Sequence, residues 1–359
     1  MADVVVVGGG VVGVACALAF ARRGADVELR EAQDGLALAA SGTNSGILHT
    51  GFDSKPGELE TELILRAAEL RPAVLEALEV PVSPAGAVLT PRTDEDRATV
   101  RALAVGAEGN GVAVAVDEDG ALHVPGESVT DPVAYVLALA GAAERHGARI
   151  RTGVRVSHPV AAAVVVNAAG LGAASVARLH GDAEFDIYPR KGEFFVFDVA
   201  PPEHILLPVP TARTKGVLVF PTLDGRTVAG PTAVDLAEAD WSVRDDARED
   251  VLAKAVVMYP PLAGAEPAFA YAGLRPAGRW DANYVVQRSQ VEPRLIHAAA
   301  IRSTGLTASL AIAERVVALA GWDDRSEAPL LAGPPRADDV AAAGPWWRRS
   351  ADHRAAGRA

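Results

Sequence analysis

The sequence has few cysteines and lacks any excess of positive charge. Cys16 is the single cysteine among 359 residues, which excludes an intramolecular disulfide, a cysteine zinc site and a self-contained iron–sulfur cluster. We expect no metal, and this cysteine usage favours a reducing, cytoplasmic compartment. The net charge of −12 leaves nothing to offset repulsion from phosphates, so we expect no nucleic-acid partner.

An uninterrupted apolar run long enough for a membrane helix is also missing. Residues 4–21 carry no charge over a length that would suit a signal or membrane helix. Glycines interrupt this run between positions 8 and 13, and Asp3 precedes it where a signal peptide carries positive charge. We therefore expect no transmembrane segment, although a location at the periphery of a membrane stays open.

The same N-terminal segment reads as a strand, a glycine-rich turn and a helix. Residues 4–7 are four valines, typical of a parallel strand that is buried on both faces. Gly8, Gly10 and Gly13 then form the pattern G-x-G-x-x-G, which permits a tight turn, close approach of backbone to a pyrophosphate, and packing of helix against strand. The predicted helix covers about residues 11–23 and stops at Gly24.

A second predicted strand, residues 26–30, ends at an acidic residue. Glu31 at this place can bind both hydroxyls of an adenosine ribose, and it disfavours a 2′-phosphate. Strand, glycines, helix, strand and acid in this order predict an α/β, Rossmann-like domain that binds an adenine dinucleotide. The motif alone does not separate FAD from NAD.

Two distant segments favour FAD. Residues 164–170 (Val-Val-Val-Asn-Ala-Ala-Gly) form another buried strand that ends in a turn of small residues, and residues 302–307 (Arg-Ser-Thr-Gly-Leu-Thr) open a last helix that runs to about residue 320. With the N-terminal motif, these segments resemble the three flavin-contacting pieces of the D-amino-acid oxidase superfamily of FAD-dependent oxidoreductases. The resemblance implies that the last helix points its N-terminus at the flavin, where its dipole stabilises negative charge.

The resemblance also implies which residues contact FAD. It assigns Val156 to the adenine, residues 168–170 to the turn beside the cofactor, and residues 304–307 to the start of the last helix. The predicted cofactor-binding residues are Gly8, Gly10, Val12, Gly13, Glu31, Ala32, Ser41, Thr43, Asn44, Ser45, Val156, Ala168, Ala169, Gly170, Thr304, Gly305, Leu306 and Thr307.

Within this superfamily, the chain resembles one branch. Residues 41–51 (Ser-Gly-Thr-Asn-Ser-Gly-Ile-Leu-His-Thr-Gly) are similar to a segment of L-2-hydroxyglutarate oxidases and the related glycerol-3-phosphate dehydrogenases, and so are residues 189–193, 230–233 and 273–276. The chain departs from this branch after His49, because Gly-Glu-Leu-Glu at residues 57–60 replaces a common Gly-Ser-Leu-Lys context. An extra cysteine-rich C-terminal domain, common in relatives, is also missing. These departures leave the exact substrate open.

The chemistry of this branch requires a base, a cation and a flavin. Oxidation of an alcohol beside an anionic group needs a base for the hydroxyl proton, and His49 is the best candidate because imidazole titrates near neutral pH. The alternative is a histidine that only hydrogen-bonds the flavin or the backbone. Arg275 is the leading clamp for the substrate anion, since a guanidinium binds a carboxylate or phosphate through two parallel bonds, unless it forms a surface salt bridge. Arg302 and Lys191 are further candidate cations.

The prediction is therefore an FAD-dependent dehydrogenase or oxidase that acts on CH–OH donors by hydride transfer to the flavin. The expected substrate is a small anionic hydroxy compound, either a 2-hydroxy acid such as L-2-hydroxyglutarate or glycerol 3-phosphate. An amine or amino-acid oxidase of the same superfamily and a flavin-carrying electron-transfer subunit remain alternatives. No second complete dinucleotide motif is present, so electrons should leave to oxygen, a quinone or a carrier protein.

The predicted domain organisation is discontinuous. Three segments, 1–82, 128–183 and 270–322, should form the FAD-binding domain. Residues 83–127 and 184–269 should form an α+β substrate domain on a mostly antiparallel sheet. Residues 329–359 are expected to be a flexible tail, in which Trp346-Trp347 belongs either to a disordered end or to an element that docks on another protein or a membrane.

Overall fold

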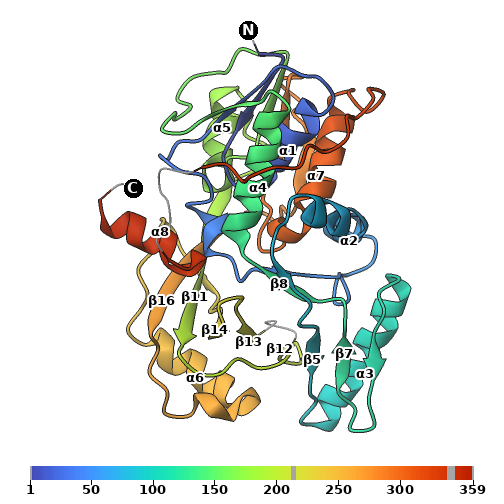
Figure 1. Cartoon of the computed structure of the whole chain (residues 1–359), viewed down its shortest axis with the longest axis vertical. Coiled ribbons are helices and arrows are strands. Elements are labelled where there is room, and N and C mark those ends of the chain that lie inside the picture. Colours follow the sequence, from blue (N-terminus) through green and yellow to red (C-terminus); the bar gives the residue numbers. More distant parts are fainter. Residues whose placement is uncertain (1, 212–215, 338–343, 358–359) are drawn as a thin grey trace.

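The computed structural model describes residues 2–211, 216–337 and 344–357 of the chain. Within these ranges the strands form two large sheets, one above the other in Figure 1, with a short sheet between them. The upper sheet is mostly parallel and the lower one mostly antiparallel. This arrangement agrees with the predicted α/β fold class.

The upper sheet follows the order β17-β18-β10-β1-β2-β9, and only the edge strand β17 runs antiparallel to its neighbour. Its central strand β1 is covered on both faces: Val4 and Val6 pack into the main core, whereas Val5 and Val7 pack with Val176 of α5. A strand buried on both faces needs apolar residues at successive positions, which explains the run of valines. The strands are β1 (Val4–Val7), β2 (Val27–Arg30), β9 (Arg149–Arg151), β10 (Val164–Asn167), β17 (Val285–Arg288) and β18 (Leu295–Ala299).

Helices cover the two faces of this sheet. α1 packs against α4 and α7, and α7 also packs against α2, as the upper half of Figure 1 shows. α1 begins directly after the glycine-rich turn and α7 begins at Gly305, as predicted. The helices are α1 (Val11–Ala21), α2 (Leu59–Ala77), α4 (Pro132–Arg145), α5 (Ala173–Leu179) and α7 (Gly305–Leu319).

The lower sheet follows the order β15-β11-β14-β13-β12-β5-β7-β6, and β16 pairs with the other edge of β11. The helix α6 (Ala247–Met258) covers one face by packing Val251 and Ala255 with Phe195 and Phe197 of β11. α3 (Asp94–Gly109) begins with a capping box, in which the side chains of Thr93 and Asp96 each accept a hydrogen bond from the other's backbone amide. The strands are β5 (Ala87–Leu89), β6 (Ala115–Val116), β7 (Leu122–Val124), β11 (Ile187–Phe197), β12 (Ile205–Leu207), β13 (Leu218–Pro221), β14 (Thr227–Gly230), β15 (Val234–Asp235) and β16 (Phe269–Gly278).

The position of β16 corrects one expected boundary. The sequence assigned residues 270–322 to the FAD-binding domain, but β16 pairs with β11 over almost its full length, from Phe269 to Gly278. The lower sheet therefore includes residues 270–278. The polypeptide returns to the upper sheet only at β17.

A short sheet connects the two halves. β3 (Ile47–Leu48) pairs with β8 (Ser128–Thr130), which pairs on its other side with β4 (Val82–Ser83). His49 directly follows β3 and Glu127 directly precedes β8. Because these two strands are antiparallel, the end of one lies beside the start of the other, which brings His49 and Glu127 together.

The structure contradicts the prediction of a flexible C-terminal tail. The expected flexible tail includes α8 (Trp346–Ala355), which packs against the body of the protein at the left of Figure 1. Trp346 and Trp347 are both buried, with ring centroids 5.8 Å from Tyr271 and 5.2 Å from Phe269, respectively. Burial of two tryptophans supplies the apolar contact that the Ala- and Pro-rich composition did not suggest. Residues 338–343 and 358–359 of the expected tail lie outside the described residues.

α8 also binds the loop that follows β2. The Arg349 side chain donates to the carbonyl of Leu36 at 2.8 Å, and His353 lies 2.5 Å from the carboxylate of Asp34. Since its aromatic residues contact β16 of the lower sheet, the helix connects the loop after β2 of the upper sheet to the lower sheet. The helix therefore has a structural role within the chain.

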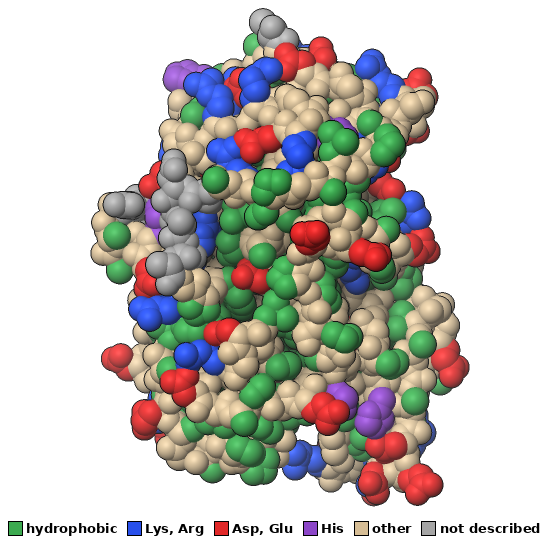
Figure 2. Space-filling view, viewed as in Figure 1, with side chains coloured by type: hydrophobic (Ala, Val, Ile, Leu, Met, Phe, Trp, Pro, Cys, Tyr) green, Lys and Arg blue, Asp and Glu red, His purple; other side chains and the backbone are tan. Residues whose placement is uncertain are grey.

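The molecular surface carries charges of both signs. In the view of Figure 2, acidic and basic side chains are interspersed around the periphery and hydrophobic side chains gather towards the middle. This face has no continuous basic surface, in line with the net charge. In the described part of the chain, no helix has the length and apolarity needed to cross a membrane.

We expect Trp346→Ala to lower the free energy of unfolding by about 3–5 kcal/mol, the usual loss for a large aromatic removed from a core. Chemical denaturation of the FAD-loaded protein, followed by circular dichroism, measures this change. Trp280, which is 74% exposed, supplies the matched control, and Trp280→Ala should change the stability by less than about 0.5 kcal/mol. Equal stability of the two variants would show that α8 does not stabilise the fold.

Candidate functional site

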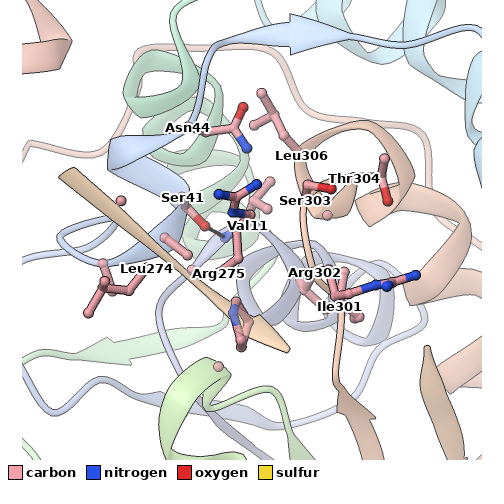
Figure 3. A pocket seen from close by; sticks show the side chains of 18 of the residues that line it. Val11, Ser41, Asn44, Leu274, Arg275, Ile301, Arg302, Ser303, Thr304 and Leu306 are labelled. Atoms are coloured by element: carbon pink, nitrogen blue, oxygen red, sulfur yellow. Dashed lines mark hydrogen bonds between the residues drawn. The ribbon is translucent and has the colours of Figure 1, made fainter. Parts of the chain in front are cut away.

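A cavity of about 1280 Å³ lies between the two large sheets. Its walls include the turn after β1, the end of β2, the start of α7 and residues of β11 and β16. Figure 3 shows labelled side chains from the start of α1, from β16 and from the start of α7 around one space, with Val11 and Ser41 on one side and Leu306 on another. The cavity therefore joins the predicted cofactor-binding segments to the predicted substrate domain.

The glycines at the upper end of the cavity are required by close backbone contacts. Gly8 has φ +114°, which L side chains rarely adopt, and a Cβ there would overlap the carbonyl oxygen of Ala168. A Cβ on Gly13 would overlap the carbonyl oxygen of Gly8. β1, α1 and the turn after β10 thus touch through backbone atoms, which matches the roles that the sequence predicted for these glycines.

Two side chains fix the rim of this turn. One carboxylate oxygen of Glu31 accepts a hydrogen bond from the Gly9 amide at 2.6 Å, and the other accepts one from the Gln33 amide at 2.8 Å. The Ser41 hydroxyl accepts from the Val11 amide at 3.0 Å. Glu31 and Ser41 both line the cavity, so their polar groups can be shared with a ligand bound there.

Two helix N-termini open into the same cavity. α1 begins after Gly10 and α7 begins after Thr304, and neither has a side-chain cap. The first residues of both helices line the cavity, so their amide groups and positive dipole ends face it. Such ends favour an anion or a group that becomes negative, as the pyrophosphate and the reduced ring of a dinucleotide flavin do.

Nearly all the predicted cofactor-binding residues line the cavity. The exceptions are Gly13 and Thr307, which lie directly behind its wall. Gly13 acts through the packing of α1 on β1. Thr307 is buried, and its hydroxyl accepts a hydrogen bond from the His49 amide at 3.1 Å. The cavity wall contains Gly8, Gly10, Val12, Glu31, Ala32, Ser41, Thr43, Asn44, Ser45, Val156, Ala168, Ala169, Gly170, Thr304, Gly305 and Leu306.

His49 lines the cavity close to the start of α7. Its Nδ1 lies 2.8 Å from a carboxylate oxygen of Glu127, whose side chain is fully buried. The histidine backbone is held as well, because Arg71 donates to its carbonyl oxygen at 2.8 Å. A histidine beside a carboxylate, at the wall of a cavity, has the partners that a general base needs.

Arg275 enters the cavity from β16. Its Nε and Nη2 atoms donate to the backbone carbonyls of Arg190, Lys191 and Thr232 at 2.8–3.2 Å. Within the described ranges, the guanidinium forms no ion pair with any carboxylate. Burial lowers the pKa of Arg275 to about 10, the positive charge of Arg190 adds to this effect, and Asp235 opposes it. Backbone carbonyls are thus the direct partners of a partly buried positive charge at the cavity wall.

The other two predicted cations have different surroundings. Arg302 lines the cavity but is partly exposed, and its side chain bonds Asn283 at 3.2 Å and approaches Glu60 at 3.8 Å. In Figure 3 it points away from Arg275. Lys191 is buried outside the cavity wall, where its ammonium bonds Asp240 at 2.5 Å and the carbonyl of Ser242 at 2.9 Å. The structure therefore brings His49, Arg275 and Arg302 to the cavity and places Lys191 in an ion pair away from it.

Two charged residues at this site were not predicted from the sequence. Glu127 follows a Pro-Gly turn, and Arg71 lies inside α2 next to Pro72. Nothing local distinguishes them from surface charges, because the contacts that bury them are distant in sequence.

A family model described as "FAD dependent oxidoreductase" (DAO) matches residues 3–319. The chain is 26% identical to a glycerol 3-phosphate oxidase of Mycoplasma pneumoniae, with 89% of this chain and 94% of the relative covered. It is 25% identical to a mitochondrial L-2-hydroxyglutarate dehydrogenase of Arabidopsis thaliana, with 88% and 82% covered. Among solved structures, the FAD-bound, dithionite-reduced L-α-glycerophosphate oxidase of Mycoplasma pneumoniae superposes with a TM-score of 0.84 at 24% identity, covering 93% of this chain and 99% of that one.

We expect Gly13→Ala to reduce the FAD bound per protein by more than about tenfold, since even one methyl group at this position overlaps the Gly8 carbonyl and forces α1 away from β1. The ratio of flavin to protein absorbance measures the loss. Gly106→Ala in α3 is the control, because a Cβ there meets no atom within 4 Å and should add helix stability of up to about 1 kcal/mol. Normal FAD content in the Gly13 variant would contradict the proposed turn.

Proposed function

The chain belongs to the DAO family of FAD-dependent oxidoreductases, and from this premise we propose that it oxidises a small anionic hydroxy compound in the cavity between its two sheets. Two relatives support this substrate class, because their names specify glycerol 3-phosphate and L-2-hydroxyglutarate. Each of these compounds carries a hydroxyl group near a phosphate or carboxylate. The proposal covers both as candidate substrates.

The observation that carries this proposal is the environment of Arg275. Even partial burial of a cation, as at Arg275, is unfavourable unless an opposite charge or strong hydrogen bonds compensate it. Among the described residues, Arg275 has three carbonyl partners but no carboxylate within ion-pair distance, and it lies at the cavity wall. A substrate anion would supply the missing charge, and a planar guanidinium would fix its orientation.

His49 is the proposed base. It lies at the cavity wall between β3 and α7, so it can take the hydroxyl proton of a substrate whose anionic group is held by Arg275. Bound FAD supplies the acceptor for the hydride. The chain's own contribution is to hold the cofactor by backbone groups, orient the substrate, and accept its proton.

The cavity fits FAD on structural grounds. Its volume and its extension between the two sheets suit a ligand longer than a mononucleotide. The close backbone contacts of the glycines shape the turn, and the Glu31 carboxylate can bind the ribose. The N-terminus of α1 can face the pyrophosphate and that of α7 the flavin ring. Oxygen, a quinone or a carrier protein is proposed as the final electron acceptor, and a cytoplasmic location is proposed from the cysteine usage.

Anaerobic mixing with candidate substrates tests the function directly. Glycerol 3-phosphate or L-2-hydroxyglutarate should bleach the flavin absorbance within one turnover, without any partner protein. Bleaching by an amino acid alone would replace the proposal with an amine-oxidising function on the same fold. Bleaching only after addition of a reduced protein would indicate an electron-transfer subunit.

For the base, we expect His49→Ala to slow anaerobic flavin reduction by about a hundredfold or more at saturating substrate, the usual loss when a general base is removed. FAD content should stay normal, because the proposed role of the imidazole ring is to contact the substrate and not to hold the cofactor. Stopped-flow absorbance measures the reduction rate. An unchanged rate with the identified substrate would restrict His49 to a structural role.

For the anion clamp, Arg275→Leu should weaken kcat/KM by at least about 2 kcal/mol, the low end for loss of a charge that pairs with a buried anion. Arg275→Lys should recover only part of this loss, because an ammonium keeps the charge but not the planar pair of donors. Steady-state kinetics measures both. Arg302→Leu is the comparison variant, and a larger effect there than at Arg275 would move the clamp to Arg302.

A further inference from the structure

A fully buried carboxylate is held beside the proposed base. Glu127 lies between β7 and β8 with 0% of its side chain exposed. Its backbone carbonyl accepts a hydrogen bond from the Gly86 amide at 2.8 Å, so the residue is fixed at both its main chain and its side chain. The carboxylate has little freedom to move towards another partner.

The two carboxylate oxygens have different partners. Oε1 accepts two hydrogen bonds from Thr50, one from its amide at 2.7 Å and one from its hydroxyl at 2.9 Å. Oε2 lies 2.8 Å from Nδ1 of His49. The Thr50 amide can only donate a hydrogen bond, so the side-chain atom of residue 127 that faces it must be a hydrogen-bond acceptor.

The backbone of His49 is fixed from two further directions. Its amide donates to the Thr307 hydroxyl at 3.1 Å, and its carbonyl accepts from Arg71 at 2.8 Å. Arg71 also donates to the carbonyl of Thr307 at 2.8 Å, which ties the histidine to the first turn of α7. The positive charge of Arg71 and the Thr50 donors compensate the negative charge of Glu127 in this dry environment.

We propose that Glu127 is a positioning residue that keeps neutral His49 protonated at Nδ1, so that the basic lone pair is on Nε2. A neutral imidazole carries one proton, and an acceptor at Nδ1 decides which nitrogen holds it. With Nδ1–H bonded to the carboxylate, the hydroxyl proton of the substrate goes to Nε2, and Glu127 stabilises the resulting imidazolium. This inference rests on the proposed function, because it takes His49 as the base.

The environment of Glu127 makes Glu127→Gln a directional test. The glutamine amide must place its oxygen towards Thr50, where two donors point at it, and its NH₂ group then faces Nδ1 of His49. The opposite orientation would set the NH₂ group against the Thr50 amide, donor against donor. His49 can accept the NH₂ hydrogen only by shifting its own proton to Nε2, which removes the base.

The first measurement is nitrogen NMR of the FAD-loaded protein with ¹⁵N-labelled histidine. The eight histidines give separate ring signals, and the spectrum of His49→Ala identifies those of His49. In the unsubstituted protein, at a pH where His49 is neutral, we expect a protonated Nδ1. In Glu127→Gln we expect a protonated Nε2 instead. A protonated Nε2 in the unsubstituted protein would overturn the proposal even if the variant did not fold.

The second measurement is the rate of anaerobic flavin reduction. Glu127→Gln should slow it by about 10²–10⁴-fold with normal FAD content, the range for loss of a base or of its correct tautomer. Glu193→Gln is the matched control, because Glu193 is another fully buried carboxylate but binds Arg244 and Thr232. That variant should leave the His49 nitrogen signals unchanged.

The two measurements separate the inference from the function on which it rests. A Glu127→Gln variant that keeps Nδ1 protonated and reduces its flavin at the normal rate would overturn the positioning role. If the His49 proton moves to Nε2 in Glu127→Gln while flavin reduction stays normal, His49 is not the base. In that case the control of the His49 tautomer by Glu127 is still established.

Discussion

The rest of the site depends on one contact, the packing of backbone on backbone where β1, α1 and the turn after β10 meet. Gly13 lies against the carbonyl of Gly8, and Gly8 lies against the carbonyl of Ala168. No side chain fits between these segments, so the distance from the sheet to the first turn of α1 is set by the backbone alone. This distance decides whether the amides of α1 can reach a pyrophosphate, and it fixes where the cavity begins.

A second constraint is the cost of keeping charges in the dry interior around the cavity. Arg71 and Glu127 share one buried region, and each has strong hydrogen-bond partners there. Arg275 differs, since carbonyl groups are its partners and its pKa is lowered by burial. Arg71 and Glu127 therefore have their hydrogen-bond partners without any ligand, and these contacts stabilise the structure. A bound anion would add an opposite charge that the direct contacts of Arg275 do not supply, and this is the basis of the substrate class proposed above.

The sequence predicted those features that depend on neighbours close along the chain. The glycine turn, the strand of valines and the start of α7 each follow from a few adjacent residues, and the structure contains all of them. Contacts between segments that are far apart in the sequence could not be predicted from it. Glu127 becomes the partner of His49 only because β3 and β8 pair, and α8 becomes part of the fold only because its tryptophans reach Phe269 and Tyr271.

The sequence predicted Arg275 as the leading clamp and Arg302 and Lys191 as further candidates, but residue type alone does not separate the three. Their surroundings do. Lys191 is paired with Asp240 of the loop between β15 and α6. Arg302 is partly exposed near Glu60, so solvent and a carboxylate both compete with any ligand there. Arg275 is on the neighbouring strand to Lys191, directly across from Arg190, but its side chain takes the cavity side of the sheet. Strand register decides which face of β11 and β16 each side chain occupies, and this places Arg275 at the cavity and Lys191 away from it.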